Sequence, residues 1–395
     1  MPEILGLIEF QMSLLLFVAL AGYLLASRIN QSAVIGEILV GLVVGPSVLG
    51  LITYTDFVRS IAHLGAVILL FVVGLEFRLE DVAKPKNLLV AVGGVIVPWV
   101  MGYLVSLAFG QPFASSVFIA TAMTATSIAI TANVLREMGK LGAPEAKVII
   151  GAAVIDDVLG LLALAIGNGL VAGSVSAPYL AGVVGKALLF VVAGGLLGHY
   201  AFRRLVLALD RSAFGRRYPE FTFIFAMMLA FFYGMGAELL GLSAIVGAFI
   251  AGASLGGLEL TTSKDLHKGS DFLQIIFASV FFVSLGVLAD VRELRPDILL
   301  FLAALTLVAI VSKLVGCGGV ALLHGDSLRD SAIIGLGMSP RGEVAMIVAL
   351  IGLDAQIIGQ DVYVSIIVMS LVTTIVAPIA LRGWFYRERT VVAVP

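Results

Sequence analysis

The chain has 395 residues, of which 60% are hydrophobic and only 13% are charged. Soluble domains carry about 25% charged residues, so this composition excludes a soluble globular protein and indicates a chain that crosses a membrane many times. The net charge of −2 leaves no basic tail for nucleic acid, and the single cysteine, Cys317, excludes an internal disulfide.

Apolar segments of roughly 20 residues, the length that a membrane-spanning helix needs, follow one another along the chain. The first lacks a basic leader and a cleavage site, so we interpret it as a retained helix and not as a signal peptide. The sequence predicts an all-α polytopic membrane protein with about thirteen transmembrane helices. The expected spans are 4–26, 33–53, 57–76, 87–109, 113–135, 148–168, 178–202, 218–238, 240–257, 272–289, 297–323, 331–353 and 361–381.

The basic residues predict how the chain is oriented. Cytoplasmic loops of membrane proteins carry an excess of Lys and Arg. If the C-terminus is cytoplasmic, about eighteen of the 24 basic residues fall on that side, and the other side receives only Arg59, Arg292 and Arg295. We therefore expect the N-terminus outside and the C-terminus in the cytoplasm, which requires an odd number of spans.

An internal repeat relates the two halves of the chain. Residues 32–36 and 243–247 share a Ser-Ala-aliphatic-aliphatic-Gly pattern, and Ser127 and Ser339 lie at nearly the same offset. The two copies begin seven expected spans apart, and because seven is odd they must have opposite orientations in the membrane. Inverted repeats of this kind are typical of secondary transporters.

Two adjacent carboxylates, Asp156 and Asp157, lie near the middle of the expected span 148–168. Ionisable residues at membrane depth are costly and suggest function by default. Neighbours on a helix point about 100° apart, so the two carboxylates can serve different partners but cannot share one proton face to face. Hard cations such as sodium prefer oxygen ligands, which makes both residues candidate metal ligands; a buried structural ion pair is the alternative.

A lysine, Lys313, lies deep in the expected span 297–323. It is too far from either end to extend its ammonium group easily to the membrane surface. We expect it to pair with Asp156 or Asp157. A purely structural role and a role in carrying a proton both remain open.

Two spans carry signals of a broken helix. Span 113–135 is unusually polar and includes Thr126 and Ser127, while span 331–353 contains the sequence Ser339-Pro340-Arg341-Gly342-Glu343. Proline beside glycine interrupts a helix, and broken helices at matching positions of two halves indicate a transport site. Arg341 and Glu343 could balance the partial charges of the helix ends, a structural role that we favour over ion contact. For the first span, packing by Ser and Thr is the alternative.

These motifs resemble those of monovalent cation:proton antiporters, in the bacterial branch that holds NapA-like sodium/proton exchangers and Kef-like potassium/proton exchangers. The matching stretches are residues 35–37, 124–127, 153–157 and 339–343, and the resemblance extends over essentially the whole chain. It implies an NhaA-like antiporter fold, an inverted repeat with two crossing discontinuous helices, in the bacterial cytoplasmic (inner) membrane. It also implies a homodimer in contact with membrane lipids.

The resemblance further implies a division of the chain into a scaffold that forms the dimer and a core that transports the ion. Residues 1–84 and 211–293 would form the scaffold, residues 85–170 and 294–395 the core, and residues 171–210 a linker helix.

The site roles also follow from the resemblance. Asp157 would bind the ion and the proton, and Asp156 would form a salt bridge with Lys313. Thr126 and Ser127 would line the unwound segment, with Ser339, Arg341 and Glu343 in support. Paired aspartates with this lysine imply electrogenic exchange of sodium (or lithium) for protons by alternating access, typically two protons for each sodium ion.

Such a protein is not an enzyme and needs no cofactor, nucleotide or nucleic acid. One alternative is a Kef-type potassium/proton antiporter without its regulatory domain. An alternative of another class is an organic-anion symporter of the bile-acid type, which has no evident need for adjacent aspartates and a buried lysine. An intramembrane aspartyl protease would need a Gly-x-Gly-Asp pattern that the sequence lacks.

Overall fold

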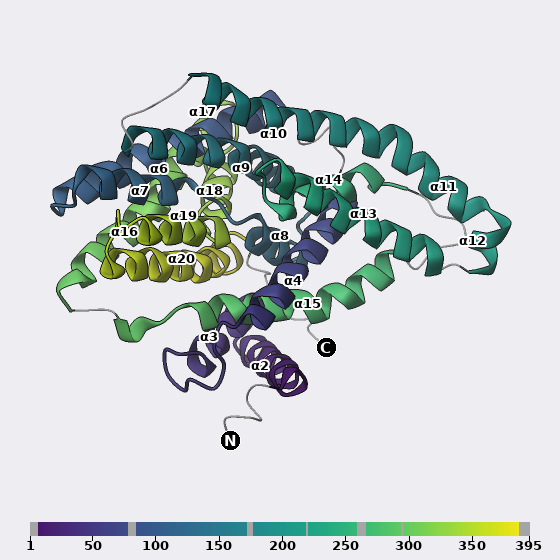
Figure 1. Cartoon of the computed structure of the whole chain (residues 1–395), viewed down its shortest axis with the longest axis horizontal. Helices are drawn as coiled ribbons and strands as arrows, with labels where there is room; N and C mark the ends of the chain where they lie inside the picture. Colours follow the sequence, from purple (N-terminus) through teal and green to yellow (C-terminus); the bar gives the residue numbers. More distant parts are fainter. Residues whose placement is uncertain are drawn as a thin grey trace, which may run out of the picture.

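The computed structural model of the chain is helical throughout the residues that it describes, namely 7–77, 84–171, 177–218, 220–258, 266–293 and 296–386 (Figure 1). Within these ranges ten helices are long and apolar enough to cross a membrane. Three further apolar helices are shorter: Ala33–Val44, Ala244–Leu255 and Val344–Leu353. Twelve residues of helix extend only about 18 Å, less than the roughly 30 Å hydrocarbon core, so the expected number of thirteen spans stays a prediction.

The first half of the chain contains the following helices: α2 (Ile8–Arg28), α3 (Ala33–Val44), α4 (Asp56–Leu75), α6 (Pro85–Ala108), α7 (Phe113–Thr124), α8 (Ile128–Glu137), α9 (Pro144–Val171) and α10 (Ala177–Leu197). A π-helical turn, η1 (Gly198–Phe202), joins α10 to the next helices: α11 (Arg203–Arg211), α12 (Ala213–Arg217), α13 (Glu220–Leu239), α14 (Ala244–Leu255) and α15 (Leu266–Leu288).

The last third begins with two short 3₁₀ turns, η2 (Val291–Glu293) and η3 (Pro296–Ile298). The remaining elements are α16 (Leu299–Lys313), a π-helical turn η4 (Leu314–Gly318), α17 (Gly319–Leu323), α18 (Leu328–Gly337), α19 (Glu343–Asp354), α20 (Gln360–Ala380) and a final π-helical turn η5 (Leu381–Phe385).

One helix continues well past the span that the sequence predicts. The sequence analysis ended a span at residue 202, before Arg203 and Arg204, whereas the helix continues as α11 to Arg211 and forms a 35-residue stretch with α10. Charged residues end a hydrophobic span, but arginine is a good helix former, so hydropathy alone misplaces this helix end. The helix ends at Ser212, whose hydroxyl instead accepts a hydrogen bond from the backbone N–H of Gly215 and starts α12.

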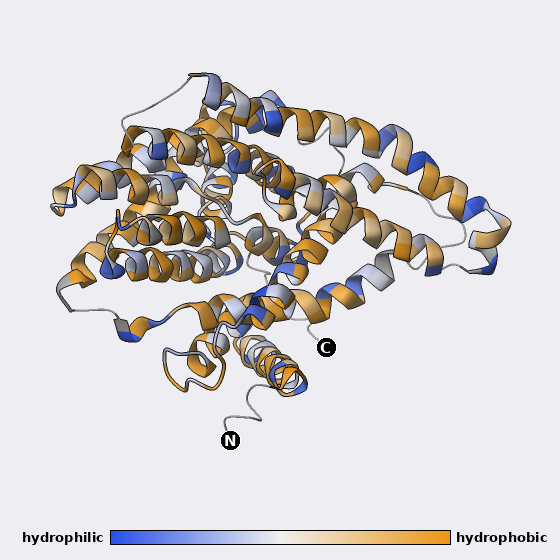
Figure 2. Ribbon diagram, viewed as in Figure 1, coloured by the Kyte–Doolittle hydropathy of each residue, from blue (hydrophilic) through white to orange (hydrophobic). Residues whose placement is uncertain are grey.

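The outward faces of the long helices are apolar. Figure 2 shows hydrophobic residues over most of the length of α10, and Leu188, Leu189, Val192 and Leu196 of this helix are exposed. Only 11% of the most apolar part of the stretch Ala177–Arg211 is buried within the protein. A large exposed apolar surface marks a contact with a partner or a membrane, and its continuity along a 35-residue helix fits lipid.

One group of helices packs around α4, which contacts α14 and α15, while α3 contacts α2 and α15. Small residues allow these close approaches. A Cβ atom at Gly252 of α14 would lie 3.0 Å from Gly74 Cα of α4 and would overlap the carbonyl oxygen of Phe71. We call α2, α3, α4, α13, α14 and α15 the α4 group.

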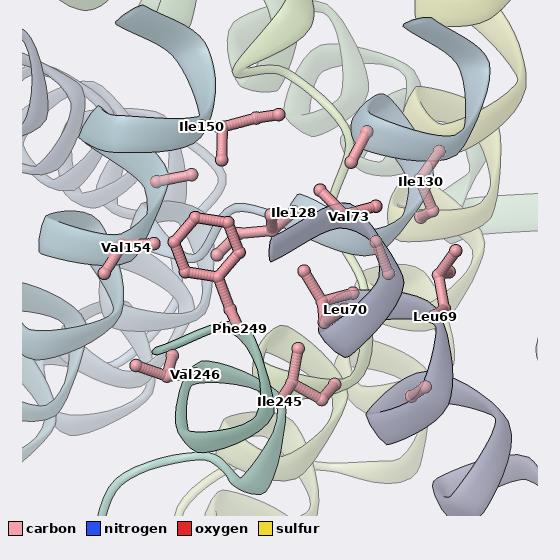
Figure 3. Close-up of a cluster of buried hydrophobic side chains, with 14 of the residues drawn as sticks. Leu69, Leu70, Val73, Ile128, Ile130, Ile150, Val154, Ile245, Val246 and Phe249 are labelled. Carbon is pink, nitrogen blue, oxygen red and sulfur yellow. The ribbon is translucent and has the colours of Figure 1, made fainter. Parts of the chain in front are cut away.

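A second group packs around α6, which contacts α7, α9 and α16, while α19 contacts α7 and α20. We call α6 to α9 and α16 to α20 the α6 group. The two groups meet at an apolar surface, shown in Figure 3. There Phe249 of α14 lies beside Ile128 of α8 and Val154 of α9, within one continuous hydrophobic core.

The contact between Gly74 and Gly252 generates a test of helix packing. Gly252→Val places a branched side chain against the backbone of α4 and should destabilise the protein by about 1–3 kcal/mol, as overpacking typically does. Thermal unfolding in detergent, followed by size-exclusion chromatography, measures the loss. Gly182→Val is the matched control, because a Cβ at Gly182 meets nothing within 4 Å; equal melting temperatures for the two variants would contradict the packing argument.

Candidate functional site

Two helices are interrupted in the middle of the protein, as the sequence predicts. Helix α7 ends at Thr124 and α8 begins at Ile128, with extended backbone between them. Helix α18 ends at Gly337 and α19 begins at Glu343. The two breaks lie against each other, because the backbone N–H of Ser127 donates a 2.8 Å hydrogen bond to the carbonyl of Pro340.

The breaks free backbone groups that the rest of the fold must satisfy. Hydroxyl groups in the first break and in α8 bind the end of α18: Thr126 donates to the carbonyl of Met338 at 3.4 Å, and Thr131 of α8 donates to that of Gly337 at 2.6 Å. The polar composition of span 113–135 is thus used to bind the other broken helix.

Two buried cations serve the C-terminal end of α7. Arg341 donates from Nη2 and Nε to the carbonyl of Met123 at 2.8 and 3.2 Å, and from Nη1 to the carbonyl of Ser339 at 2.8 Å. Lys313 donates to the carbonyl of Thr124 at 2.8 Å. Since the C-terminal end of a helix carries partial negative charge, both cations stabilise the break. The side chain of Glu343, the other charge expected here, lies outside the described part of the structure.

Lys313 and Asp156 form the ion pair that the sequence analysis expected. The Lys313 ammonium lies 3.3 Å from Asp156 Oδ1 and also donates to Thr126 Oγ1 at 2.7 Å. The side chains of the pair are 0% and 1% exposed. The second carboxylate oxygen of Asp156 has no hydrogen-bond partner among the residues that the structure describes. A buried carboxylate oxygen without a partner is costly and is a candidate ligand for an incoming cation.

The neighbourhood of this ion pair depends on residues that the sequence analysis did not single out. Lys313 is the last residue of α16, and the π-helical turn η4 follows at once; such turns are frequent at functional sites. Gly94 of α6 faces the pair, since a Cβ there would lie 3.4 Å from Lys313 Nζ and 2.6 Å from Cys317 Sγ. In the sequence, the adjacent glycines Gly93 and Gly94 indicate a close approach of another helix, but they do not indicate which helix approaches.

Asp157 faces a different way from Asp156. It is half-buried and lines a cavity of about 10 Å³ together with Thr126, Ser127 and Gly342. That is about the space that one water molecule needs. Ile245 of α14 also lines the cavity, so the α4 group and the α6 group meet at this point. The cavity offers carboxylate and hydroxyl oxygens, the ligands that hard cations prefer.

The remaining expected residue, Ser339, is buried away from the cavity wall and donates to the carbonyl of Gly335 at 2.9 Å. In the described ranges no three His, Cys, Asp or Glu side chains gather as a group that could hold a metal ion. The cavity therefore offers the oxygens of Asp157, Thr126 and Ser127. The unpartnered oxygen of Asp156 belongs to the neighbouring residue on α9.

Comparison with known proteins gives consistent matches over nearly the whole chain. The family model described as the sodium/hydrogen exchanger, transmembrane, matches residues 14–386. The chain is 34% identical over 378 residues to the Na(+)/H(+)-K(+) antiporter GerN of Bacillus cereus, covering 95% of this chain and 96% of GerN. It is 32% identical over 428 residues to the high-affinity Na(+)/H(+) antiporter NhaS3 of Synechocystis, covering 97% of this chain and 91% of NhaS3.

The fold is similar to that of a solved structure. The sodium proton antiporter MjNhaP1 of Methanocaldococcus jannaschii superimposes with a TM-score of 0.74 at 17% sequence identity, covering 97% of this chain and 98% of MjNhaP1. At this identity the likeness supports the fold alone.

The contacts of Arg341 predict a cost for removing its charge. Arg341→Gln shortens the side chain and leaves the carbonyl of Met123 without its donors, and an unsatisfied buried acceptor costs about 1–3 kcal/mol. We expect a lower melting temperature in detergent. Arg211→Gln, on the exposed end of α11, serves as the control. A variant as stable as the parent protein would show that the end of α7 needs no cation.

Proposed function

The chain belongs to the sodium/hydrogen exchanger family, and we propose that it exchanges sodium ions for protons at the cavity lined by Asp157. It is a multi-pass membrane transporter and not an enzyme. Lithium is a second candidate ion. We propose no cofactor, because the energy for moving one ion comes from the gradient of the other.

The observation that carries this proposal is the position of Asp157. Its carboxylate lines a cavity of about 10 Å³ at the crossing of two broken helices, beside the hydroxyl-bearing residues Thr126 and Ser127. An acid in such a place can hold either a proton or a small cation but not both, because each neutralises the same negative charge. Competition for one carboxylate couples the two flows, provided that the empty charged site crosses the membrane poorly.

The pair of Lys313 and Asp156 supports an electrogenic cycle. With no cation bound, the ammonium group of Lys313 neutralises Asp156 at 3.3 Å. A sodium ion near both aspartates would compete with that ammonium for Asp156 and, by repulsion between like charges, favour release of its proton. One proton from Asp157 and one from Lys313 would then exchange for one sodium ion, and each cycle would move net charge.

We propose that the two groups of helices are the two moving parts. The α4 group would be the scaffold and the α6 group the core, with alternating access arising from movement of one against the other. The chain would cross a bacterial cytoplasmic membrane thirteen times as an inverted repeat, with its N-terminus outside and its C-terminus in the cytoplasm. We also propose that two copies of the chain form a homodimer through the scaffold. Native mass spectrometry in mild detergent measures whether the protein is a dimer or a monomer.

Potassium is a third candidate ion. The observation in its favour is the name of GerN, which describes a Na(+)/H(+)-K(+) antiporter that is 34% identical to this chain. Purified protein in proteoliposomes, assayed with sodium, lithium or potassium as the only cation, with and without a clamped membrane potential, decides the ion and the electrogenicity. Failure of every monovalent cation to dissipate an imposed pH gradient would refute the proposed function.

Asp157→Asn tests the exchange site directly. The substitution keeps the shape of the side chain but removes its charge and its titration. We expect the exchange rate to fall at least about 100-fold, which corresponds to roughly 2.7 kcal/mol. The variant should still insert into the membrane and elute normally in size-exclusion chromatography. Wild-type exchange by the purified variant would show that another group binds the ion.

Lys313→Gln separates the two roles of the lysine. If Lys313 carries a transported proton, the variant should exchange sodium for protons without moving net charge, because only Asp157 then titrates. Currents on solid-supported membranes, measured beside pH-driven sodium uptake in the same vesicles, give the charge moved for each sodium ion. An unchanged value, together with a lower melting temperature, would instead assign Lys313 a purely structural role.

A further inference from the structure

Helix α8 has two functional ends. Its N-terminal end, Ser127 to Ala129, lines the cavity of Asp157. Its C-terminal turn carries three polar residues, Asn133, Arg136 and Glu137, about 20 residues in sequence from Asp157. None of the three belongs to the transport site described above. All three contact helices of the α4 group, whereas α8 itself belongs to the α6 group.

Arg136 makes the central contacts. Its Nε donates to Glu76 Oε1 at the end of α4 over 3.0 Å, and its two terminal nitrogens donate to Gln274 and Asp271 of α15. A planar guanidinium with five donors suits such a convergence. One side chain of α8 thus ties together two helices of the other group.

Glu137 and Asn133 extend these contacts. Glu137 Oε2 accepts a 3.3 Å hydrogen bond from the backbone N–H of Ala33, the first residue of α3, where a negative charge favours the helix end. Gln274 donates to Asn133 Oδ1 at 3.1 Å, and Asn133 donates to Glu137 Oε1 at 3.1 Å. We name the three α8 residues and their partners on α3, α4 and α15 the clasp.

The clasp differs in kind from the rest of the contact between the two groups. The middle of that contact is apolar: Ile128 of α8 packs between Phe249 and Leu70 of the α4 group (Figure 3). Apolar attraction is non-directional and survives a small shift of one surface over the other. Hydrogen bonds and ion pairs are directional, so the clasp fixes one relative position of α8.

We infer that the clasp holds α8 against the α4 group in one end state of the transport cycle and must open for exchange to proceed. Arg136 is then a positioning residue, because it acts on the Asp157 cavity through α8 and touches no transported ion. This inference rests on the proposed exchange function.

The strength of the clasp suits a contact that opens in every cycle. The Arg136 side chain is 25% exposed, and those of Glu76 and Asp271 are 38% and 43% exposed. Partly solvated ion pairs contribute little individually, so water can replace them when α8 moves. A clasp of this kind shifts the balance between two end states by about tenfold and does not lock one of them.

Arg136→Ala, Arg136→Lys and the control Arg59→Ala test the positioning role. Arg59 pairs with Asp56 on its own helix and lies over the ring of Tyr54 just before that helix, so its loss should leave transport unchanged. In oriented proteoliposomes, losing the clasp lowers the population of one end state and raises that of the other. We therefore expect the KM for sodium in Arg136→Ala to rise about threefold to tenfold from one side of the membrane and to fall from the other, with partial rescue in Arg136→Lys. A merely structural arginine would lower the amount of active protein and leave both KM values unchanged, and that result would overturn the inference.

A cross-link tests the need for opening. Asn133 and Gln274 touch in the structure, so cysteines at both positions should react with a short thiol cross-linker, which mass spectrometry of the purified protein detects without any transport assay. We expect the cross-linked protein to lose exchange and to recover it on reduction, while each single-cysteine variant keeps it. Continued exchange in the cross-linked protein, or no cross-link at all, would overturn the inference. If the double-cysteine variant cross-links but the parent protein, which lacks both cysteines, exchanges no cation, the result would instead refute the proposed function.

Discussion

The free carbonyl groups at the C-terminal end of α7 impose the constraint on which the rest of the centre depends. A helix that stops inside a membrane leaves acceptors that no water can satisfy, and it ends in partial negative charge. The chain meets this need with two cations from its second half, Arg341 at the carbonyl of Met123 and Lys313 at that of Thr124. Their burial then requires counter-charges, and Asp156 is one of them. The proposed transport site and the stabilisation of the helix break thus use the same side chains.

This charge balance explains how one buried centre can respond to ions. Two cations, two adjacent carboxylates and the end of a helix lie in a medium of low dielectric constant, where each charge strongly influences its neighbours. Arg341 keeps its proton under all ordinary conditions and fixes the geometry of the break. In the proposed cycle, a sodium ion would compete with a proton at Asp157 and with the Lys313 ammonium at Asp156. The proposed coupling therefore requires no conformational change within the site beyond the movement of the two helix groups.

The surface between the two helix groups complements this centre. Its apolar middle, around Phe249 and Ile128, excludes water from the side of the cavity without prescribing one position. Its polar edge at Arg136 prescribes a position but lies where water can reach it. The ten-residue helix α8 reaches both the edge and the cavity, so one rigid element joins them.

The sequence by itself determined the all-helical membrane class, the two broken helices and the pairing of Lys313 with an adjacent aspartate, because each follows from local composition or from the cost of burying a charge. The residue pattern alone left open which aspartate takes the lysine, whereas the family resemblance named Asp156. The rotation of α9 against α16 decides it: Asp156 faces Lys313, and Asp157 faces the cavity. The sequence misplaced the end of the helix after residue 202, where hydropathy and helix propensity disagree. Only the tertiary structure decided three further features: the backbone partners of Arg341, the close approach at Gly94, and the contacts of Arg136 with α4 and α15. Each of these joins residues that lie far apart in the chain. The sequence around one partner gives no indication of the other.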